Sequence, residues 1–253
     1  MTLFEKLITL VSYIKQPAKR KMINLAATFK NQVGLEVGGP SAFFNFRMAF
    51  PIYLYARMID GVNFSNSTIW EGEIAQGNLY RYYKNKQGYQ FIGEASDLNG
   101  VKDASYDFVL SCHSLEHVAN PIKALKDWSR VMKQKGRLVL VLPDKEFTFD
   151  HHRPITSLAH LIEDYNNNID ESDTTHFEEV IALHDFNYDN FVHSKEELIQ
   201  RTNLNIENRA VHHHVFNLDL IKEMLIYCGF EMIHQQTYPP FHLVSVAKKI
   251  NSI

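Results

Sequence analysis

Short apolar runs alternate with longer amphipathic stretches through the middle of the chain. Four runs have the length and composition of strands: "QVGLEV" (32–37), "YQFIGEAS" (89–96), "SYDFVLSC" (105–112) and "RLVLVLPD" (137–144). The last is apolar at consecutive positions, which is typical of a strand buried on both faces of a parallel sheet. Residues 114–136 carry apolar side chains at helical spacing, and we expect Gly136 to end that helix. Strand, helix and strand joined by short loops predict a right-handed βαβ unit.

The C-terminal part continues the alternation. Residues 218–230 predict a helix that stops at Gly229, and residues 231–238 and 242–249 predict two strands joined by a short turn. The pattern as a whole predicts an α/β fold built around a mostly parallel sheet.

Residues 1–30 predict a helical extension that precedes this alternation. Leu7, Val11 and Ile14 recur at helical spacing, and basic residues follow them. The apolar run is short and interrupted by charges, so it predicts neither a signal peptide with a cleavage site nor a membrane-spanning helix. We expect the helix to pack on the domain; the alternative is a helix that makes peripheral contact with a membrane or lies on a partner protein.

Residues 145–211 are polar and rich in His, Asp and Asn. Ser194 and Glu197 fit a capping box, and three stretches predict short helices: 157–165, 175–184 and 194–204. An insertion of this kind commonly covers the active-site end of an open α/β sheet, although a solvent-exposed elaboration fits nearly as well. The predicted plan is a single domain over 1–253, with a core (31–144 and 212–249), the N-terminal extension (1–30) and a helical insertion or lid (145–211).

Composition narrows the class of protein without naming a function. The 253 residues are 45% hydrophobic and 22% charged, which is ordinary for a globular domain. A formal net charge of −3 argues against a nucleic-acid partner, which usually needs a basic surface. Cys112 and Cys228 lie far apart and form neither a disulfide framework nor a zinc spacing, so we expect a cytoplasmic location. Histidine is the unusual component, at 13 residues.

The stretch "VGLEVGGPS" (33–41) places a carboxylate directly before a glycine turn. It is not a phosphate-binding P-loop, because no Gly-Lys-Ser/Thr follows, and it lacks the third glycine of a dinucleotide fingerprint. Gly38 and Gly39 still let a ligand approach the bare backbone closely. Glu36 beside that backbone suits a ligand that carries a positive charge and ribose hydroxyls, as S-adenosylmethionine does.

Several motifs together resemble the class I S-adenosylmethionine-dependent methyltransferases, in particular the type 11 methyltransferase-domain family. They are "LEVGGPS", "MIDGVNFS", "GEASDL", "SYDFVLSCHSLEHVANP", "LKDWSRVMKQKGRLVLVLPD" and "HHVFNLDLIKEMLIYCGFEMI". The resemblance is strong over about residues 31–145 and looser over the last forty. It implies a Rossmann-like, mostly parallel sheet with an antiparallel last strand, helices on both faces and a helical insertion after the fifth strand. The chain also resembles methyltransferases associated with glycan biosynthesis.

The resemblance implies S-adenosyl-L-methionine as the cofactor and a set of binding residues. Asp60, at the end of the second strand, would face the ribose hydroxyls, and the loop after the third strand would hold the adenine. The implied cofactor-binding residues are Glu36, Gly38, Gly39, Pro40, Asp60, Ser96, Asp97, Leu98 and Ser111.

Transfer of a methyl group to a hydroxyl needs a base or a metal, and histidine is the natural base near neutral pH. His113 directly follows the strand 105–112, and His152 follows the strand 137–144 with Asp150 placed to orient its ring. We therefore expect His113, His152 and Asp150 to be catalytic. No compact ligand motif such as His-Glu-x-x-His is present, so we expect no metal.

The acceptor is expected to be a sugar, a glycan or another small molecule bearing a hydroxyl. Residues expected to bind it are Trp70, His151, Arg153 and His213, with Arg153 pairing an anionic group. Alternatives are an N-methyltransferase, a nicotinamide-dependent enzyme and a non-catalytic cofactor-binding or interaction protein. The oligomeric state is open.

Overall fold

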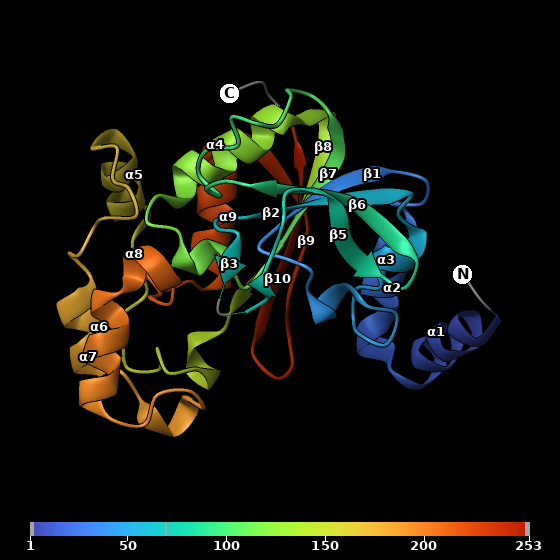
Figure 1. The fold of residues 1–253 in the computed structure, drawn as a ribbon. Helices are drawn as coiled ribbons and strands as arrows, with labels where there is room; N and C mark the ends of the chain where they lie inside the picture. Colours follow the sequence, from blue (N-terminus) through green and yellow to red (C-terminus); the bar gives the residue numbers. More distant parts are fainter. Residues whose placement is uncertain (1–2, 69, 251–253) are drawn as a thin grey trace.

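The structure, a computed structural model, describes residues 3–68 and 70–250, and its strands form a twisted central sheet (Figure 1). Within the described residues, eight strands pair in the order β5-β6-β2-β1-β7-β8-β10-β9. They are β1 (Val33–Val37), β2 (Met58–Asn63), β5 (Gly77–Tyr83), β6 (Lys86–Ile92), β7 (Tyr106–Cys112), β8 (Met132–Pro143), β9 (Phe230–Tyr238) and β10 (His242–Lys249). β3 (Ser67–Thr68) and β4 (Gly72–Glu73) form a separate two-stranded ladder.

Strand direction follows the predicted α/β pattern. β6, β2, β1, β7 and β8 run parallel, whereas β10 lies antiparallel to both β8 and β9. The mostly parallel sheet with an antiparallel last strand is therefore confirmed. β5, which pairs antiparallel with β6 at the edge, was not predicted; it lies in an aromatic segment without clear strand alternation.

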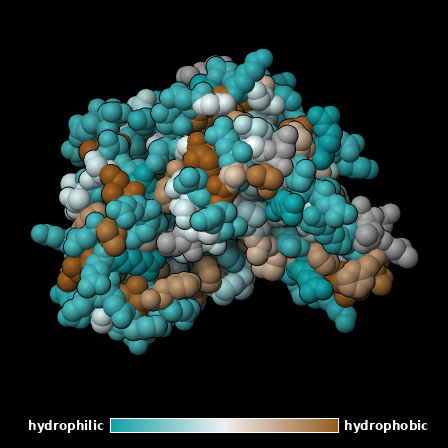
Figure 2. All heavy atoms as spheres, in the orientation of Figure 1, coloured by the Kyte–Doolittle hydropathy of each residue, from teal (hydrophilic) through white to brown (hydrophobic). Residues whose placement is uncertain are grey.

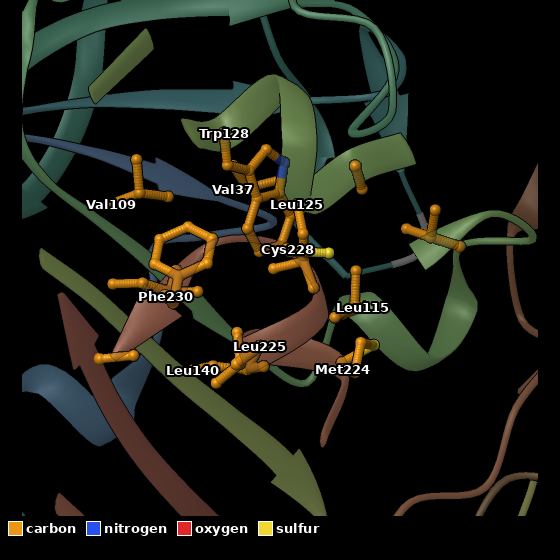
Figure 3. Close-up of a cluster of buried hydrophobic side chains, with 14 of the residues drawn as sticks. Val37, Val109, Leu115, Leu125, Trp128, Leu140, Met224, Leu225, Cys228 and Phe230 are labelled. Atoms are coloured by element: carbon orange, nitrogen blue, oxygen red, sulfur yellow. The ribbon is translucent and has the colours of Figure 1, made fainter. Parts of the chain in front are cut away.

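Helices cover both faces of the sheet, as predicted. α4 (Pro121–Val131) and α9 (Leu218–Tyr227) pack on one face, and Figure 3 shows Trp128 and Leu125 of α4 close to Leu225 and Cys228 from the α9 segment. α2 (Pro17–Ala27) and α3 (Ile52–Tyr55) cover the other face with a cluster of aromatic rings. Leu138, Leu140 and Leu142 belong to the first cluster, and Val139 and Val141 to the second. The strand 137–144 is thus buried on both faces, as its sequence predicts.

The helix predicted for residues 114–136 is shorter in the structure. Asn120 caps α4 by accepting from the backbone N–H of Lys123, and Pro121 occupies its first turn. The helix ends at Val131, and the chain continues directly into β8 with Met132 fully buried. Gly136 therefore does not end a helix. A β-carbon there would lie 2.8 Å from the carbonyl oxygen of Lys133, so the glycine instead permits a close backbone approach.

The N-terminal segment divides into two parts with different surroundings. In α2, Met22 and Ala26 are fully buried in the second core cluster, so this helix belongs to the domain itself. In α1 (Leu3–Lys15), Leu7 and Ile14 are exposed, and an apolar patch is visible at the lower right of Figure 2. α1 packs on the domain, as expected, but it does so through Glu5, which is 1% exposed and accepts from Tyr83 Oη, while its apolar side faces outward. Among the described residues, no helix has both the length and the apolar character needed to cross a membrane.

The insertion lies beside α4 and α9, at the left of Figure 1. Its helices are α5 (Leu158–Asn166), α6 (Phe177–Leu183), α7 (Lys195–Asn203) and α8 (Asn205–Asn208). The predicted cap of α7 is present, because Ser194 Oγ accepts from the backbone N–H of Glu197 and the Glu197 carboxylate accepts from that of His193.

Candidate active site

A cavity of about 440 Å³ lies at the carboxyl ends of the parallel strands. Its wall includes residues at the ends of β1, β2, β6, β7 and β8: Val37, Gly38, Asn63, Gly93, Glu94, Ala95, His113, Ser114 and Pro143. The strand order reverses between β1 and β7, and open α/β sheets bind ligands in the crevice at such a point. The volume falls within the range of small-molecule sites.

The glycine turn after β1 forms one edge of this cavity. Gly38 is exposed to it, has a φ of 77°, and would place a β-carbon 2.5 Å from Ser114 Oγ. Its backbone N–H donates to the Val62 carbonyl, and the Asn63 side chain donates to the Gly39 carbonyl at 3.1 Å. The turn is thus pinned between β1 and β2 and presents bare backbone to a ligand. Pro40 does not line the cavity.

Glu36 does not face the cavity. Its side chain is fully buried on the opposite side of β1, where it accepts hydrogen bonds from Tyr53 Oη at 2.7 Å, Tyr80 Oη at 2.7 Å and the Ser41 N–H at 2.9 Å. Burial outweighs these hydrogen bonds and raises the pKa of Glu36 to about 7. A direct cofactor contact does not fit this geometry. Glu36 instead holds the start of the loop at Ser41.

Asp60 does not line the cavity either. It lies inside β2, and its carboxylate accepts from Tyr106 Oη and from the Tyr89 N–H, both at 2.7 Å. The strand continues for three more residues, so Asn63 occupies the end position that the sequence analysis gave to Asp60. Asn63, rather than Asp60, therefore forms the part of the cavity wall at the end of β2.

The residues of the loop after β6 that line the cavity come earlier in the sequence than the expected ones. Gly93, Glu94 and Ala95 line it, whereas Asp97 and Leu98 line a neighbouring cavity that shares Gly93 and Glu94 with the first. The remaining three predicted contacts, Gly39, Ser96 and Ser111, line neither cavity. Ser111 is fully buried in β7, and its hydroxyl has no hydrogen-bond partner among the described residues.

His113 lies in the cavity wall, as expected. Its Nε2 is 2.8 Å from Nδ1 of His242, and its Nδ1 is 3.5 Å from the carboxylate of buried Glu116. Burial opposes ionisation of Glu116, but His113, His117 and His212 outweigh it and lower the pKa of this carboxyl. Burial also lowers the pKa of His242 to about 4. The two ring nitrogens of His113 thus face a carboxylate and a second imidazole.

The expected pair of His152 and Asp150 is not formed. His152 is exposed, its Nε2 lies 3.4 Å from an Asp185 oxygen, and it does not line the cavity. Asp150 is buried and accepts instead from Nδ1 of His212 and, at 2.8 Å, from Arg153. Burial opposes this ionisation, yet His212 and Arg153 lower the pKa of Asp150 to about 2. The aspartate thus orients His212, which does line the cavity.

Arg153 is not free to bind an anionic acceptor. It is 1% exposed and donates to Asp150, to Glu179 at 2.9 Å and to the carbonyls of His212 and His213. The arginine fastens the insertion to the segment before α9.

The other three predicted acceptor contacts have different surroundings. Trp70 lines the cavity, half-exposed, with its ring 5.8 Å from that of His117. His151 does not line it but stacks on Tyr188, which does. His213 is fully buried and pairs with the Asn205 side chain at 3.1 Å, so it does not fit a substrate contact.

Sequence reasoning missed most of the cavity wall that the insertion supplies. The missed residues are mainly aromatic or charged: Phe147, Phe149, Glu171, Tyr188, Phe191, Arg201 and Arg209. Arg209 donates to Glu94 at 2.5 Å, yet its Nε and Nη1 are buried with no partner among the described residues. Burial raises the pKa of Glu171 to about 7. The aromatic residues at the borders of the polar insertion are the one sequence signal that could have indicated these cavity residues.

Two groups of side chains have the spacing of metal ligands. One consists of Glu116, His117 and His212 and borders the cavity. The other consists of His160, Asp164 and His176 of the insertion and His214 before α9. In each group the potential ligand atoms lie within 4.8 Å of one another.

Comparison with known proteins finds a matching domain family for part of the chain and a shared fold. Residues 55–140 match the sequence profile of a methyltransferase domain family (Methyltransf_11). An S-adenosylmethionine-dependent methyltransferase from Mesorhizobium loti superposes with a TM-score of 0.52 at 13% identity, covering 92% of this chain and 96% of that one. A protein from Listeria monocytogenes, assigned to the same class, gives a TM-score of 0.50 at 14% identity with the same coverage. At these identities the structural likeness concerns the fold. The search of curated proteins found no match.

Proposed function

We propose that this chain, which belongs to the class I S-adenosylmethionine-dependent methyltransferases, methylates a hydroxyl group of a sugar, a glycan or another small molecule. The observation that carries the proposal is His113, which lines the cavity with its Nδ1 3.5 Å from the Glu116 carboxylate and its Nε2 2.8 Å from His242 Nδ1, a contact that an acceptor hydroxyl would displace. A hydroxyl acceptor needs such a base, whereas an amine acceptor does not.

The cavity fits the cofactor at the ends of β1, β2 and β6. A β-carbon at Gly38 would fill the space beside Ser114, and Asn63 and the Gly93–Ala95 backbone lie around the same end of the cavity. These residues would hold S-adenosylmethionine, whose sulfonium supplies an already activated methyl group. The protein's part is then to align the acceptor and to remove its proton.

Proton removal falls to His113. An acceptor oxygen that reaches Nε2 takes the place that His242 Nδ1 occupies in the structure, 2.8 Å away. The imidazole gains the proton, and the ionised Glu116 carboxylate at Nδ1 stabilises the imidazolium that forms. The aromatic residues of the insertion and Trp70 supply the stacking surfaces that suit a sugar ring, and the free donors of Arg209 suit a negatively charged substituent.

The test replaces His113 with glutamine and uses His152→Gln as the matched control. Both variants lose an imidazole, but only His113 lines the cavity. With labelled S-adenosylmethionine and a panel of hydroxyl and amine acceptors, His113→Gln should lose roughly two to four orders of magnitude in turnover at unchanged cofactor affinity. His152→Gln should keep the parent rate. Equal rates for both variants on the true acceptor, or transfer to amines alone, would contradict the proposal.

We also propose that α1 makes peripheral contact with an anionic membrane surface on the cytoplasmic side. Its exposed apolar side chains are Phe4, Leu7, Leu10, Val11 and Ile14, and exposed Lys15 and Lys21 follow them. Apolar insertion combined with lysines near anionic lipid is the usual basis of such contact.

Cosedimentation with phosphatidylserine-containing vesicles tests this membrane contact. The chain should bind these vesicles more than neutral phosphatidylcholine vesicles, and Leu7→Glu should weaken the binding. Leu204→Glu, at an equally exposed leucine in the insertion, should not. Equal binding to the two kinds of vesicle, together with equal binding by Leu7→Glu and Leu204→Glu, would refute the membrane contact.

A further inference from the structure

Four metal-ligating side chains from three separate segments meet where the insertion joins the core. His160 and Asp164 lie one turn apart on α5, His176 directly precedes α6, and His214 precedes α9. We call these four residues the His–Asp cluster. None of them lines the main cavity, so the cluster is separate from the proposed methyl-transfer site.

The distances within the cluster match those between ligands of one small ion. His160 Nε2 is 3.1 Å from His176 Nε2 and 3.5 Å from Asp164 Oδ2, and each of the four residues offers a ligand atom within 4.8 Å of the others. Tetrahedral zinc with bonds of about 2.0–2.1 Å separates its ligand atoms by about 3.3 Å. The two shortest distances in the cluster are therefore already close to those in a zinc site.

Hydrogen bonds do not satisfy all the buried polar atoms of the cluster. Asp164 Oδ2 and His214 Nδ1 are both buried, and neither has a hydrogen-bond partner among the described residues. Two ring nitrogens of His160 and His176 face each other, so one proton at most can lie between them. A cation at the centre would satisfy the carboxylate and the ring lone pairs together, which explains why they are directed at one point.

The surrounding backbone holds these ligands in place. Asn120 donates from its side chain to the carbonyl of Asp164 at 3.1 Å, and His214 Nε2 lies 3.1 Å from the carbonyl of Ala119. Thr156 and Val215 exchange hydrogen bonds beside His214. Hydrogen bonds from surrounding groups to the ligating residues are typical of metal centres. Part of the His160 side chain reaches solvent, which gives an ion a path of entry.

We propose that His160, Asp164, His176 and His214 bind one Zn²⁺ ion that fastens the insertion to the core. Three imidazoles and one carboxylate form a closed set of four ligands, as expected for a structural rather than a catalytic zinc. The sequence analysis expected no metal because these ligands span residues 160–214 without a compact motif. Folding alone brings them together.

The Glu116, His117 and His212 group is the competing site within the described residues. There, Nδ1 of His117 lies 3.1 Å from the Val211 carbonyl, and Nδ1 of His212 pairs with Asp150. Glu116 interacts with His113. Glu116 Oε2 is buried without a partner among the described residues, but Nδ1 is hydrogen-bonded in both histidines of this group, whereas Nδ1 of His214 is not.

The experiment measures zinc in the purified full-length chain by mass spectrometry and then titrates Zn²⁺ into chain stripped with a chelator. We expect one ion per chain and a Tm that falls on stripping and recovers with Zn²⁺. His160→Asn removes a partly exposed ligand and should weaken Zn²⁺ binding by more than about 100-fold. Loss of a hydrogen-bond partner of a ligand alone typically lowers metal affinity by about 10–100-fold. The matched variant His117→Asn should bind Zn²⁺ like the parent.

Two outcomes would overturn the zinc site. One is a stripped parent chain that binds no Zn²⁺ although its circular dichroism spectrum shows it folded. The other is loss of the ion in His117→Asn together with its retention in His160→Asn, which would assign the metal to the cavity group. Neither readout involves methyl transfer, so failure here and failure of the proposed function are distinguishable.

Discussion

At the residue scale, Glu36 shows how a correct motif can yield a wrong contact. The sequence places a carboxylate before a glycine turn, but side chains alternate between the faces of a strand. Leu35 and Val37 pack with the first core cluster, so Glu36 points to the other face, among Tyr53 and Tyr80. Sequence alone did not reveal that two tyrosines, 17 and 44 residues away, would meet this carboxylate.

The buried Glu36 predicts a specific dependence of stability on pH. Its pKa is raised from 4.5 to about 7 on folding, so the folded chain binds the proton more tightly than the unfolded chain. The stabilising contribution of this proton to the free energy of unfolding is present below pH 4.5 and is lost as the pH rises towards 7. Its loss lowers the free energy of unfolding by up to about 3 kcal/mol. Urea unfolding of the parent and of Glu36→Gln between pH 5 and 8 measures the difference. A Glu36→Gln variant with the same pH slope as the parent would refute the assignment.

At the element scale, the strands and most helices follow from periodicity, and the boundaries do not. Lys133 and Lys135 are typical of a helix C-terminus, yet Met132 is buried and pairs with Tyr106 as the start of β8. Tertiary packing decided this boundary, because pairing with β7 buries the methionine. The insertion helices were found by their caps and apolar residues, but their contacts with the core came from residues far apart in sequence.

Asn120 connects two elements, and its replacement should show this. Its side chain caps α4 and donates to the carbonyls of Asp164 and Ile169 near the end of α5, while it is 1% exposed itself. Asn120→Ala should lower the free energy of unfolding by about 2–4 kcal/mol, because a cap and two buried hydrogen bonds are lost. Ser194→Ala, which removes only the cap of α7, should cost about 1 kcal/mol. Equal losses in urea unfolding would show that Asn120 acts as a cap alone.

At the scale of the whole molecule, the order of elements determined the fold and the location of the site. Parallel strands with short crossovers place their carboxyl ends at one edge, and Gly38 and His113, which each follow such a strand, both line the cavity. The expected roles of Asp60, Asp150, His152, Arg153 and His213 do not fit, because burial and pairing partners depend on contacts between distant segments. The cavity wall from the insertion, including Arg209, was missed for the same reason.

Calorimetric titration with S-adenosylhomocysteine tests the central claim, that the cavity beside the glycine turn holds the cofactor. The parent should bind one molecule per chain and should give no heat with NAD. Gly38→Ala should weaken binding by at least about tenfold, since its β-carbon would lie 2.5 Å from Ser114 Oγ. Gly72→Ala, with a similarly positive φ of 69° but open space around it, should lose about 1 kcal/mol of stability and keep the parent affinity. A folded parent chain without affinity for S-adenosylhomocysteine, or equal affinity in Gly38→Ala and the parent, would contradict the account.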